Sequence, residues 1–225
     1  MQNSSSTKST ALWIIATLIV AVSVFAIVKI ASKSSGETPE TSTIPANVSE
    51  VTDLDQTKGN KSSKIILVEY SDFQCPACAA YSPLVKQINN EMSEKILFVY
   101  RHFPLAQHKN ARPAAYAAEA AGRQGKFWEM HDMIFENQLS WSKSSPGEAE
   151  DTFGTYAEKL GLNMEQFKTD RESDEVEEKV DNDYKSGTSS GVPGTPAFFV
   201  NGKKLPNPRS YEEFKQLIEY VGSNP

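Results

Sequence analysis

The sequence predicts an α/β domain, because two short apolar runs flank one amphipathic helix and a helical block precedes a final hairpin and helix. The runs cover residues 65–68 and 96–100, are too short for helices, and are typical of strands buried on both faces. Apolar residues between them recur at i, i+3, i+4 and i+7, at Tyr81, Leu84, Val85 and Ile88. Two strands joined by such a crossover helix are expected to be parallel.

The second half of the chain is first helical and then changes period. Residues 109–185 have a helical pattern, whereas residues 197–200 indicate a strand. Asn201 and Gly202 are a type I′ hairpin signal, so residues 203–205 are expected to return antiparallel. Ser210 and Glu213 predict a capping box for a last helix, whose inner face would be Tyr211, Phe214, Leu217, Ile218 and Val221.

The N-terminal region has the features of a membrane anchor. Residues 11–28 carry no charge, and eighteen helical residues rise about 27 Å, close to the hydrocarbon thickness of a bilayer. We therefore expect a transmembrane helix over residues 11–30. Lys8 on one side and Lys29 and Lys33 on the other are nearly balanced, so these charges do not orient it. A cleaved signal peptide is the alternative, but the apolar run leads into Lys29 without a small-x-small cleavage site.

The segment after the anchor has the composition of a tether. Residues 31–63 are rich in Ser, Thr, Lys, Glu, Asn and Pro, which predicts a flexible linker, with an edge strand expected near residues 51–54. The folded domain is then expected over residues 64–225, with a helical insertion over about residues 106–188.

Charge and cysteine content exclude several classes of function. The net charge of −6 lies wholly beyond residue 63, and an acidic domain is a poor binder of nucleic acid. The two cysteines lie in one C-x-x-C, so a disulfide elsewhere is excluded. A structural zinc site would need two further ligands, and His102, His108 and His131 show no paired spacing. We interpret these histidines as structural or surface residues.

The motif Cys75-Pro76-Ala77-Cys78 follows the first predicted strand and opens the first helix. A sulfur at a helix N-terminus lies beside unpaired N–H groups and the positive end of the dipole, which lowers its pKa. Pro76 suits the first helical turn, and Cys78 lies one turn further on, so Cys75 is expected to attack and Cys78 to resolve. A structural disulfide is the alternative, but so short a loop would stabilise the fold little.

The segment that contains this motif, YSDFQCPAC, resembles the active-site segment of the DsbA-like thiol–disulfide oxidoreductases, particularly their membrane-tethered bacterial members. Three further segments, RHFPL, QGKFWE and GTPAFFVNG, resemble the family pattern in the same order. The four segments are residues 70–78, 101–105, 124–129 and 194–202, and the similarity covers about residues 50–222.

The resemblance implies a thioredoxin-like fold with a helical insertion, preceded here by one transmembrane helix. It makes Thr195 and Pro196 the cis-proline loop that packs against the cysteines, with Pro193 as the competing proline. The backbone of Thr195 would then pair with an extended substrate polypeptide.

The resemblance also places a buried carboxylate at Glu69, six residues before Cys75. Such a group could transfer the proton of Cys78. Lys95 opens the neighbouring strand and could pair with Glu69, although both could equally be exposed charges at strand ends.

The resemblance implies an oxidase that passes the Cys75–Cys78 disulfide to reduced exported polypeptides and uses no other cofactor. A quinone-coupled membrane partner of the DsbB-like or VKOR-like kind would reoxidise it. Pro76 and Ala77 tune the stability of the thiolate. Strongly oxidising relatives carry His where this chain has Ala77, which supplies no imidazole, so we expect a milder oxidant than those relatives. The alternatives are a reductase or isomerase, or a non-catalytic chaperone or metallochaperone. Such chemistry requires a domain outside the cytosol, which places residues 1–10 in the cytoplasm. We also expect a monomer.

One acidic stretch invites a different interpretation. Residues 165–183 contain nine acids and three bases, and Asp181-Asn182-Asp183 suggests calcium. The ligand spacing of an EF-hand is absent, so a solvated helix face is the better interpretation, with an irregular cation site as the alternative.

Overall fold

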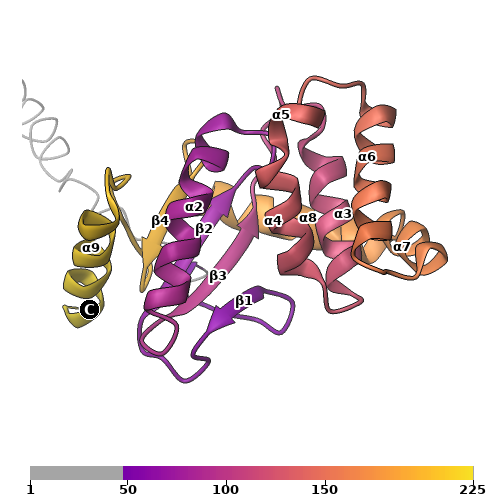
Figure 1. Cartoon of the computed structure of the whole chain (residues 1–225). Helices are drawn as coiled ribbons and strands as arrows, with labels where there is room; N and C mark the ends of the chain where they lie inside the picture. Colours follow the sequence, from indigo (N-terminus) through magenta and orange to yellow (C-terminus); the bar gives the residue numbers. More distant parts are fainter. Residues whose placement is uncertain (1–47, 225) are drawn as a thin grey trace, which may run out of the picture. The chain divides into compact units, whose positions relative to one another are not determined.

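The computed structural model describes residues 48–224, so the expected anchor over residues 11–30 lies outside the described part. The described chain forms a five-stranded sheet in the order β1-β3-β2-β4-β5 (Figure 1). Its strands are β1 (Gln56–Gly59), β2 (Ile66–Ser71), β3 (Leu97–His102), β4 (Ala197–Val200) and β5 (Lys203–Lys204). Strands β2 and β3 are parallel, as the crossover helix predicted, and the other pairs are antiparallel.

The helices divide between the sheet and an insertion. Helix α2 (Pro76–Glu91) is the crossover helix, and α9 (Tyr211–Ser223) packs beside it. The insertion comprises α3 (Ala111–Gly122), α4 (Phe127–Glu136), α5 (Gln138–Trp141), α6 (Pro146–Lys159), α7 (Met164–Arg171) and α8 (Asp174–Ser189). This is the helical block expected over residues 106–188. No helix within residues 48–224 combines the length and the apolar character needed to cross a membrane.

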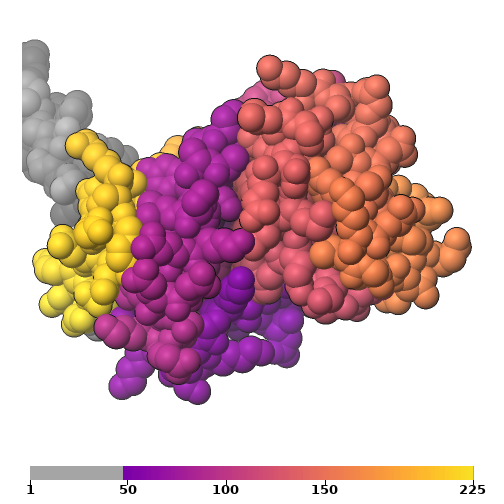
Figure 2. Space-filling view, in the orientation of Figure 1, coloured from indigo at the N-terminus to yellow at the C-terminus, as the bar shows by residue number. Residues whose placement is uncertain are grey.

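The sheet has two covered faces. Helices α2 and α9 cover one face, and α8 runs behind the other, as Figure 1 shows. Helix α8 approaches the sheet closely at Gly187, because glycine has no Cβ. An added Cβ there would lie 2.5 Å from the Phe103 ring. The helical insertion packs beside α2, as Figure 2 shows, and its helix α4 contacts α2. The insertion thus flanks the helix whose first residues carry the cysteine motif.

Strand register decides which polar groups lie under α2. Leu67 packs with residues of α2, whereas Val68 and Tyr70 pack in the cluster on the other face. Successive side chains of a strand alternate between faces, so Glu69 and Ser71 lie on the α2 face. Glu69 is paired across the sheet with Tyr100 of β3 on one side. These three residues are therefore neighbours beneath the start of α2.

The N-terminal boundary of the domain differs from the expectation. Residues 51–54 are not an edge strand: Thr52 donates from its backbone N–H to Asp55 Oδ2 at 2.8 Å, closing a turn. The edge strand is β1, which pairs antiparallel with β3. The predicted tether to residue 63 was also too long, because Val48 is fully buried and Asp55 pairs with Arg101. Composition alone could not reveal these long-range contacts.

The C-terminal expectations are confirmed with one correction. Asn201 and Gly202 have φ values of 48° and 81°, as a type I′ turn requires. Ser210 Oγ accepts from the Glu213 N–H at 3.2 Å and caps α9. The Glu213 carboxylate, however, accepts from the N–H of Arg209 at 2.7 Å and not from that of Ser210, so the reciprocal half of the capping box is wrong.

Candidate active site

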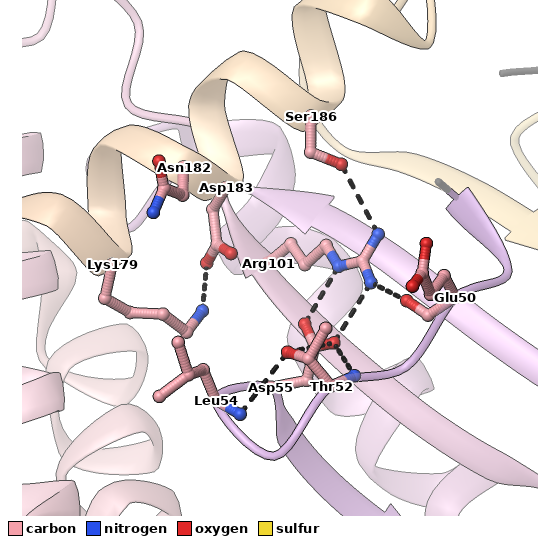
Figure 3. Close-up of a pocket in the computed structure, with 9 residues that line it drawn as sticks. All are labelled: Glu50, Thr52, Leu54, Asp55, Arg101, Lys179, Asn182, Asp183 and Ser186. Atoms are coloured by element: carbon pink, nitrogen blue, oxygen red, sulfur yellow. Dashed lines mark hydrogen bonds and ion pairs between the residues drawn. The ribbon is translucent and has the colours of Figure 1, made fainter. Parts of the chain in front are cut away.

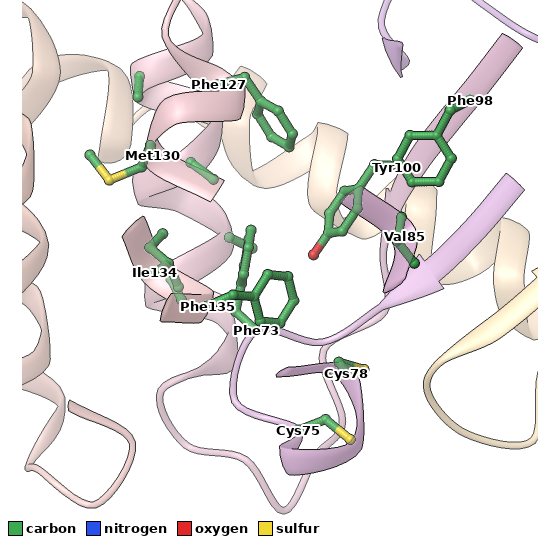
Figure 4. Close-up of a cluster of buried hydrophobic side chains, with 14 of the residues drawn as sticks. Phe73, Cys75, Cys78, Val85, Phe98, Tyr100, Phe127, Met130, Ile134 and Phe135 are labelled. Carbon is green, nitrogen blue, oxygen red and sulfur yellow. The ribbon is translucent and has the colours of Figure 1, made fainter. Parts of the chain in front are cut away.

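Both cysteines lie at the start of α2, as Figure 4 shows. Cys75 is the N-cap with extended backbone angles, and Pro76 occupies the first helical position, where a missing N–H costs nothing. Both thiols are free in this structure, and Pro76 and Ala77 are exposed. Cys75 is 7% exposed and Cys78 is fully buried. Only Cys75 is therefore accessible to an incoming sulfur.

The two thiols differ strongly in acidity. A hydrogen bond with the Cys78 side chain is the largest cause that lowers the pKa of Cys75, to about 5. Thr195 and the backbone N–H groups of Cys78 and Ala77 add to this effect, and partial burial opposes it. Burial, followed by the interaction with Cys75, raises the pKa of Cys78 well above its usual range. Cys75 is therefore the more acidic of the two thiols, which suits the attacking role predicted for it; that role stays a prediction.

The Thr195–Pro196 peptide bond is cis, and it is the cis bond found among the described residues, so Pro193 is not the cis proline. Cys75 Sγ lies 3.5 Å from the carbonyl oxygen of Thr195. Asn207 Nδ2 donates to the carbonyl oxygen of Pro196 at 3.5 Å. The loop that the resemblance assigned to substrate binding is thus in contact with the reactive sulfur.

Glu69 lies beneath the cysteine motif and is 3% exposed. Burial raises its pKa to about 7, and the nearby Ser71 hydroxyl lowers it by a smaller amount. The expected pairing with Lys95 is wrong, because Lys95 Nζ lies 3.3 Å from Glu219 Oε1 at the surface. The register explains this, since Glu69 lies opposite Tyr100, five residues beyond Lys95 along β3.

Asp72 is a site residue that sequence reasoning missed, although it lies inside the matching motif. Its side chain is fully buried, and Oδ1 accepts from the Gln74 N–H at 2.7 Å. Oδ2 accepts from the Leu105 N–H at 2.8 Å and lies 2.7 Å from His108 Nδ1. The N–H of Asp72 donates to Cys78 Sγ at 3.5 Å. Asp72 therefore ties the loop after β3 to the cysteine motif.

The insertion also holds the motif, through residues that gave no sequence signal. Gln138 of α5 is buried, and its Nε2 donates to the carbonyl oxygens of Phe73 at 2.7 Å and Cys75 at 2.9 Å. Gln74 Nε2 donates to the Ser142 carbonyl at 2.6 Å. The insertion thus fixes the backbone on which the reactive sulfur is carried.

The acidic stretch forms α8 and has protein partners. Asp181 lies 2.7 Å from Arg112 Nη1, and Asp183 lies 2.5 Å from Lys179 Nζ. Asp183 also accepts from the His102 N–H at 3.0 Å. Within residues 48–224, no group of three or more His, Cys, Asp or Glu is arranged to hold a metal ion.

A pocket on the α8 face contains a second set of buried charges, which Figure 3 shows. Arg101 Nε donates to Asp55 Oδ1 at 2.9 Å, and Arg101 Nη2 donates to the Glu50 carbonyl. The Lys179–Asp183 pair lines the same pocket. This pocket lies on the side of the sheet opposite α2 and is separate from the cysteine motif.

The histidines have structural contacts. His102 Nε2 lies 2.8 Å from the buried Glu119 carboxylate. His131 is buried, and its ring packs edge-on against Tyr100 at 4.9 Å. His108, in contrast, contacts Asp72 and is 19% exposed, so it belongs to the surroundings of the active site.

Residues 52–220 match the family described as thioredoxin. The chain therefore belongs to the thioredoxin family. Two curated relatives are named as Na⁺/H⁺ antiporters of the NhaA type. The Salinispora arenicola protein is 38% identical over 153 residues, which are 68% of this chain and 22% of that protein. The Herminiimonas arsenicoxydans protein is 36% identical over 181 residues, 80% of this chain and 27% of that protein. The chain thus spans about a quarter of their length.

Solved structures share the fold of the described residues. A thioredoxin-like oxidoreductase from Silicibacter pomeroyi has a TM-score of 0.64 at 25% identity, over 76% of this chain and 94% of that one. Bacillus subtilis BdbD, in its oxidised form, has a TM-score of 0.65 at 23% identity over the same shares. Wolbachia pipientis α-DsbA1 has a TM-score of 0.66 at 19% identity, over 77% and 94%. These likenesses show that the described residues have a thioredoxin-like fold, as the sequence resemblance implied.

Proposed function

We propose that this chain is an oxidase that introduces disulfides into exported polypeptides through Cys75 and Cys78. The observation that carries the proposal is the lowered pKa of Cys75, about 5. A stabilised thiolate stabilises the reduced form, and the corresponding disulfide is then a stronger oxidant. The exposed Ala77 adds no imidazole to this stabilisation, so a mild oxidant is expected.

The exchange proceeds in two displacements. A substrate thiolate attacks Cys75 Sγ of the disulfide, a bond forms between these sulfurs, and the Cys75–Cys78 bond breaks as Cys78 leaves. A second substrate thiolate then attacks the substrate sulfur of this mixed disulfide and releases Cys75 as a thiolate. The substrate is oxidised by two electrons and the cysteine pair is reduced. The low pKa of Cys75 makes it a good leaving group in the second step.

The cis-proline loop is the proposed substrate grip. The Thr195 carbonyl lies 3.5 Å from Cys75 Sγ, so an extended segment paired with this backbone would carry its sulfur to Cys75. Backbone pairing requires no particular sequence, which suits an enzyme that acts on many reduced, unfolded polypeptides.

Glu69 is the proposed proton carrier for Cys78. It is buried on the face of β2 that lies under α2, and burial raises its pKa to about 7. A group that titrates near neutral pH can both give and take the proton of Cys78 as that thiol leaves and returns.

The proposal includes an anchor over residues 11–30, with the catalytic domain outside the cytosol. It is supported by the uncharged run over residues 11–28 and by the need of disulfide chemistry for an oxidising compartment. A quinone-coupled membrane partner would reoxidise Cys75 and Cys78. Protease added to intact cells should digest the domain, and full protection would contradict this orientation.

The redox direction is tested by equilibrating the full-length protein with glutathione buffers and quantifying dithiol and disulfide. We expect a potential clearly above the value of about −270 mV that is typical of thioredoxin. A potential near that value would contradict the oxidase and favour a reductase or isomerase, which would also need a supply of electrons.

The catalytic nature of the site is tested with Cys75→Ser and a reduced, unfolded substrate. We expect dithiol oxidation to be lost, because the attacked sulfur is removed. Retained activity would favour a chaperone or metallochaperone that only binds. Lys203→Ala, an exposed position on β5, is a control that should oxidise the substrate normally.

A further inference from the structure

Two buried hydroxyl groups lie on the same face of the sheet as Glu69 and are not used in the exchange steps above. Ser71 of β2 is 1% exposed, and Tyr100 of β3 is fully buried. Ser71 lies two residues beyond Glu69 on the same strand face, and Tyr100 lies directly opposite Glu69. Figure 4 shows the Tyr100 hydroxyl directed toward Phe73, at the end of the sheet that carries the cysteines.

Neither hydroxyl has a direct hydrogen-bond partner in residues 48–224. Ser71 Oγ and Tyr100 Oη are both inaccessible to solvent and unpaired. Buried polar atoms are nearly always hydrogen-bonded to protein or to an internal water, so two adjacent unpaired hydroxyls indicate a polar site. Such a site can hold one water when it offers two to four polar partners.

Ser71 influences the acidity of both Glu69 and Cys78. The Ser71 hydroxyl lowers the pKa of both Glu69 and Cys78, although burial is the larger influence on each and raises it. The pKa of Tyr100 is raised, first by burial and then by the nearby charges of Glu69 and Cys78. Tyr100 therefore stays protonated and remains a hydrogen-bond donor.

We propose that the hydroxyls of Ser71 and Tyr100 hold one internal water and form a proton relay between Glu69 and Cys78. The inference rests on the proposed function, since it concerns the proton that accompanies each departure and return of Cys78. Ser71 both donates and accepts, so it passes the proton on. Tyr100 only orients the water, because it keeps its own proton.

The transfer is balanced. When Cys78 leaves as a thiolate, it takes a proton from the relay, and the Glu69 carboxyl replaces that proton through the water and Ser71 Oγ. When Cys78 attacks a mixed disulfide, its proton moves in the opposite direction to the Glu69 carboxylate. One S–H bond and one O–H bond exchange, and no further reactant is needed.

Other ionisable groups surround this site and must be considered in a pH profile. The Asp72 carboxylate is held by Gln74, Leu105 and His108. Two buried histidines also pack on the Tyr100 ring: His102, which is paired with Glu119, and His131, which contacts Asp132. Cys75 is the remaining charge, and its pKa of about 5 separates its titration from that of Glu69 at about 7.

The test follows the attack of Cys78 on a mixed disulfide. Reduced full-length protein is mixed with glutathione disulfide, and acid-quenched samples are analysed by mass for capture of glutathione at Cys75 and its release by Cys78. In the wild type the release rate should rise through about pH 7 as Glu69 ionises. Ser71→Ala should lower release at neutral pH at least about tenfold and abolish this rise, while capture stays within about twofold.

Further variants separate a relay from a packing role. Ser71→Thr keeps a hydroxyl and should restore most of the release rate, and Tyr100→Phe should slow release less than Ser71→Ala. In a Glu69→Gln background, Ser71→Ala should cause no additional loss, because the two act in one step. Ser186→Ala removes the serine of a serine–tyrosine pair on the opposite face and is the matched control.

The outcomes distinguish the two proposals. Wild-type rate and wild-type pH dependence in Ser71→Ala would overturn the relay and leave the proposed function intact. If the wild type failed to exchange with glutathione disulfide, the proposed function itself would fall and the relay with it. If Ser71→Ala folded poorly, as shown by thermal unfolding, Ser71→Thr and Tyr100→Phe would carry the test.

Discussion

The two faces of strands β2 and β3 bury polar groups in opposite ways. On the α8 face, Arg101 is bound by Asp55 at 2.9 Å and by the Tyr70 hydroxyl at 3.2 Å. On the α2 face, the Ser71 and Tyr100 hydroxyls have no direct partner among the described residues, and the pKa of Glu69 is raised to about 7.

The two faces differ in whether a buried carboxyl group has a charged partner. Against the effect of burial, Arg101 holds the pKa of Asp55 below its usual range, so that pair stays ionised. A buried group without a charged partner instead titrates near neutral pH and is available for proton transfer. Pairing on the α8 face therefore keeps Asp55 ionised, whereas Glu69 has a pKa of about 7, which suits the proton transfer proposed for it.

Removal of one partner on the α8 face should have the largest effect on stability. Asp55→Ala leaves the buried guanidinium of Arg101 without its carboxylate, and such changes cost about 3–5 kcal/mol. Urea unfolding should show a loss of this size, while the redox exchange rate per folded molecule stays unchanged. A loss below about 1 kcal/mol would remove the structural meaning of the comparison.

Glu69→Gln should change the free energy of unfolding in the opposite direction and stabilise the domain above neutral pH. The folded-state pKa of Glu69, about 7, lies above its usual value, so the folded protein binds the extra proton. The stability that Glu69 contributes is complete at low pH and falls as pH rises toward and through 7. At pH 8 Glu69→Gln should therefore be more stable than the wild type by up to about 3 kcal/mol, and near pH 4 the two should be similar. Equal stability at both pH values would contradict the assigned burial.

Asp72→Asn should lower the free energy of unfolding by an intermediate amount. The carboxylate accepts from two backbone N–H groups on different sides, and an amide presents a donor to one of them. We expect a loss of about 1–3 kcal/mol in urea unfolding. Hydrogen exchange should increase in the loop that contains Leu105 and His108. Unchanged exchange there would show that Asp72 does not hold this loop.

Lys95→Ala should have the smallest effect. Lys95 pairs with Glu219 at the surface and not with Glu69, and exposed pairs contribute little. We expect a change below about 0.5 kcal/mol and an unaltered pH profile of release by Cys78. An altered profile would reinstate an electrostatic link between Lys95 and Glu69.

Local patterns predicted much of the fold. The strand at Ala197–Val200 and its turn at Asn201 and Gly202 were predicted correctly, because a short apolar run and the preference of Asn-Gly for positive φ angles are local properties. The edge strand was misplaced, since β1 owes its existence to pairing with β3 and carries no strong apolar signal. Gln138 was missed because its importance depends on a contact 63 residues away in the sequence.

The sequence by itself determined the reactive centre. Cys75 and Cys78 lie at a helix start because of their spacing and Pro76, and helix-end chemistry acts over a few residues only. The tertiary structure alone decided the surroundings, including Asp72, Gln138 and the hydroxyls of Ser71 and Tyr100. Burial and strand register bring distant groups together, and these are properties of the packed sheet that no local segment contains.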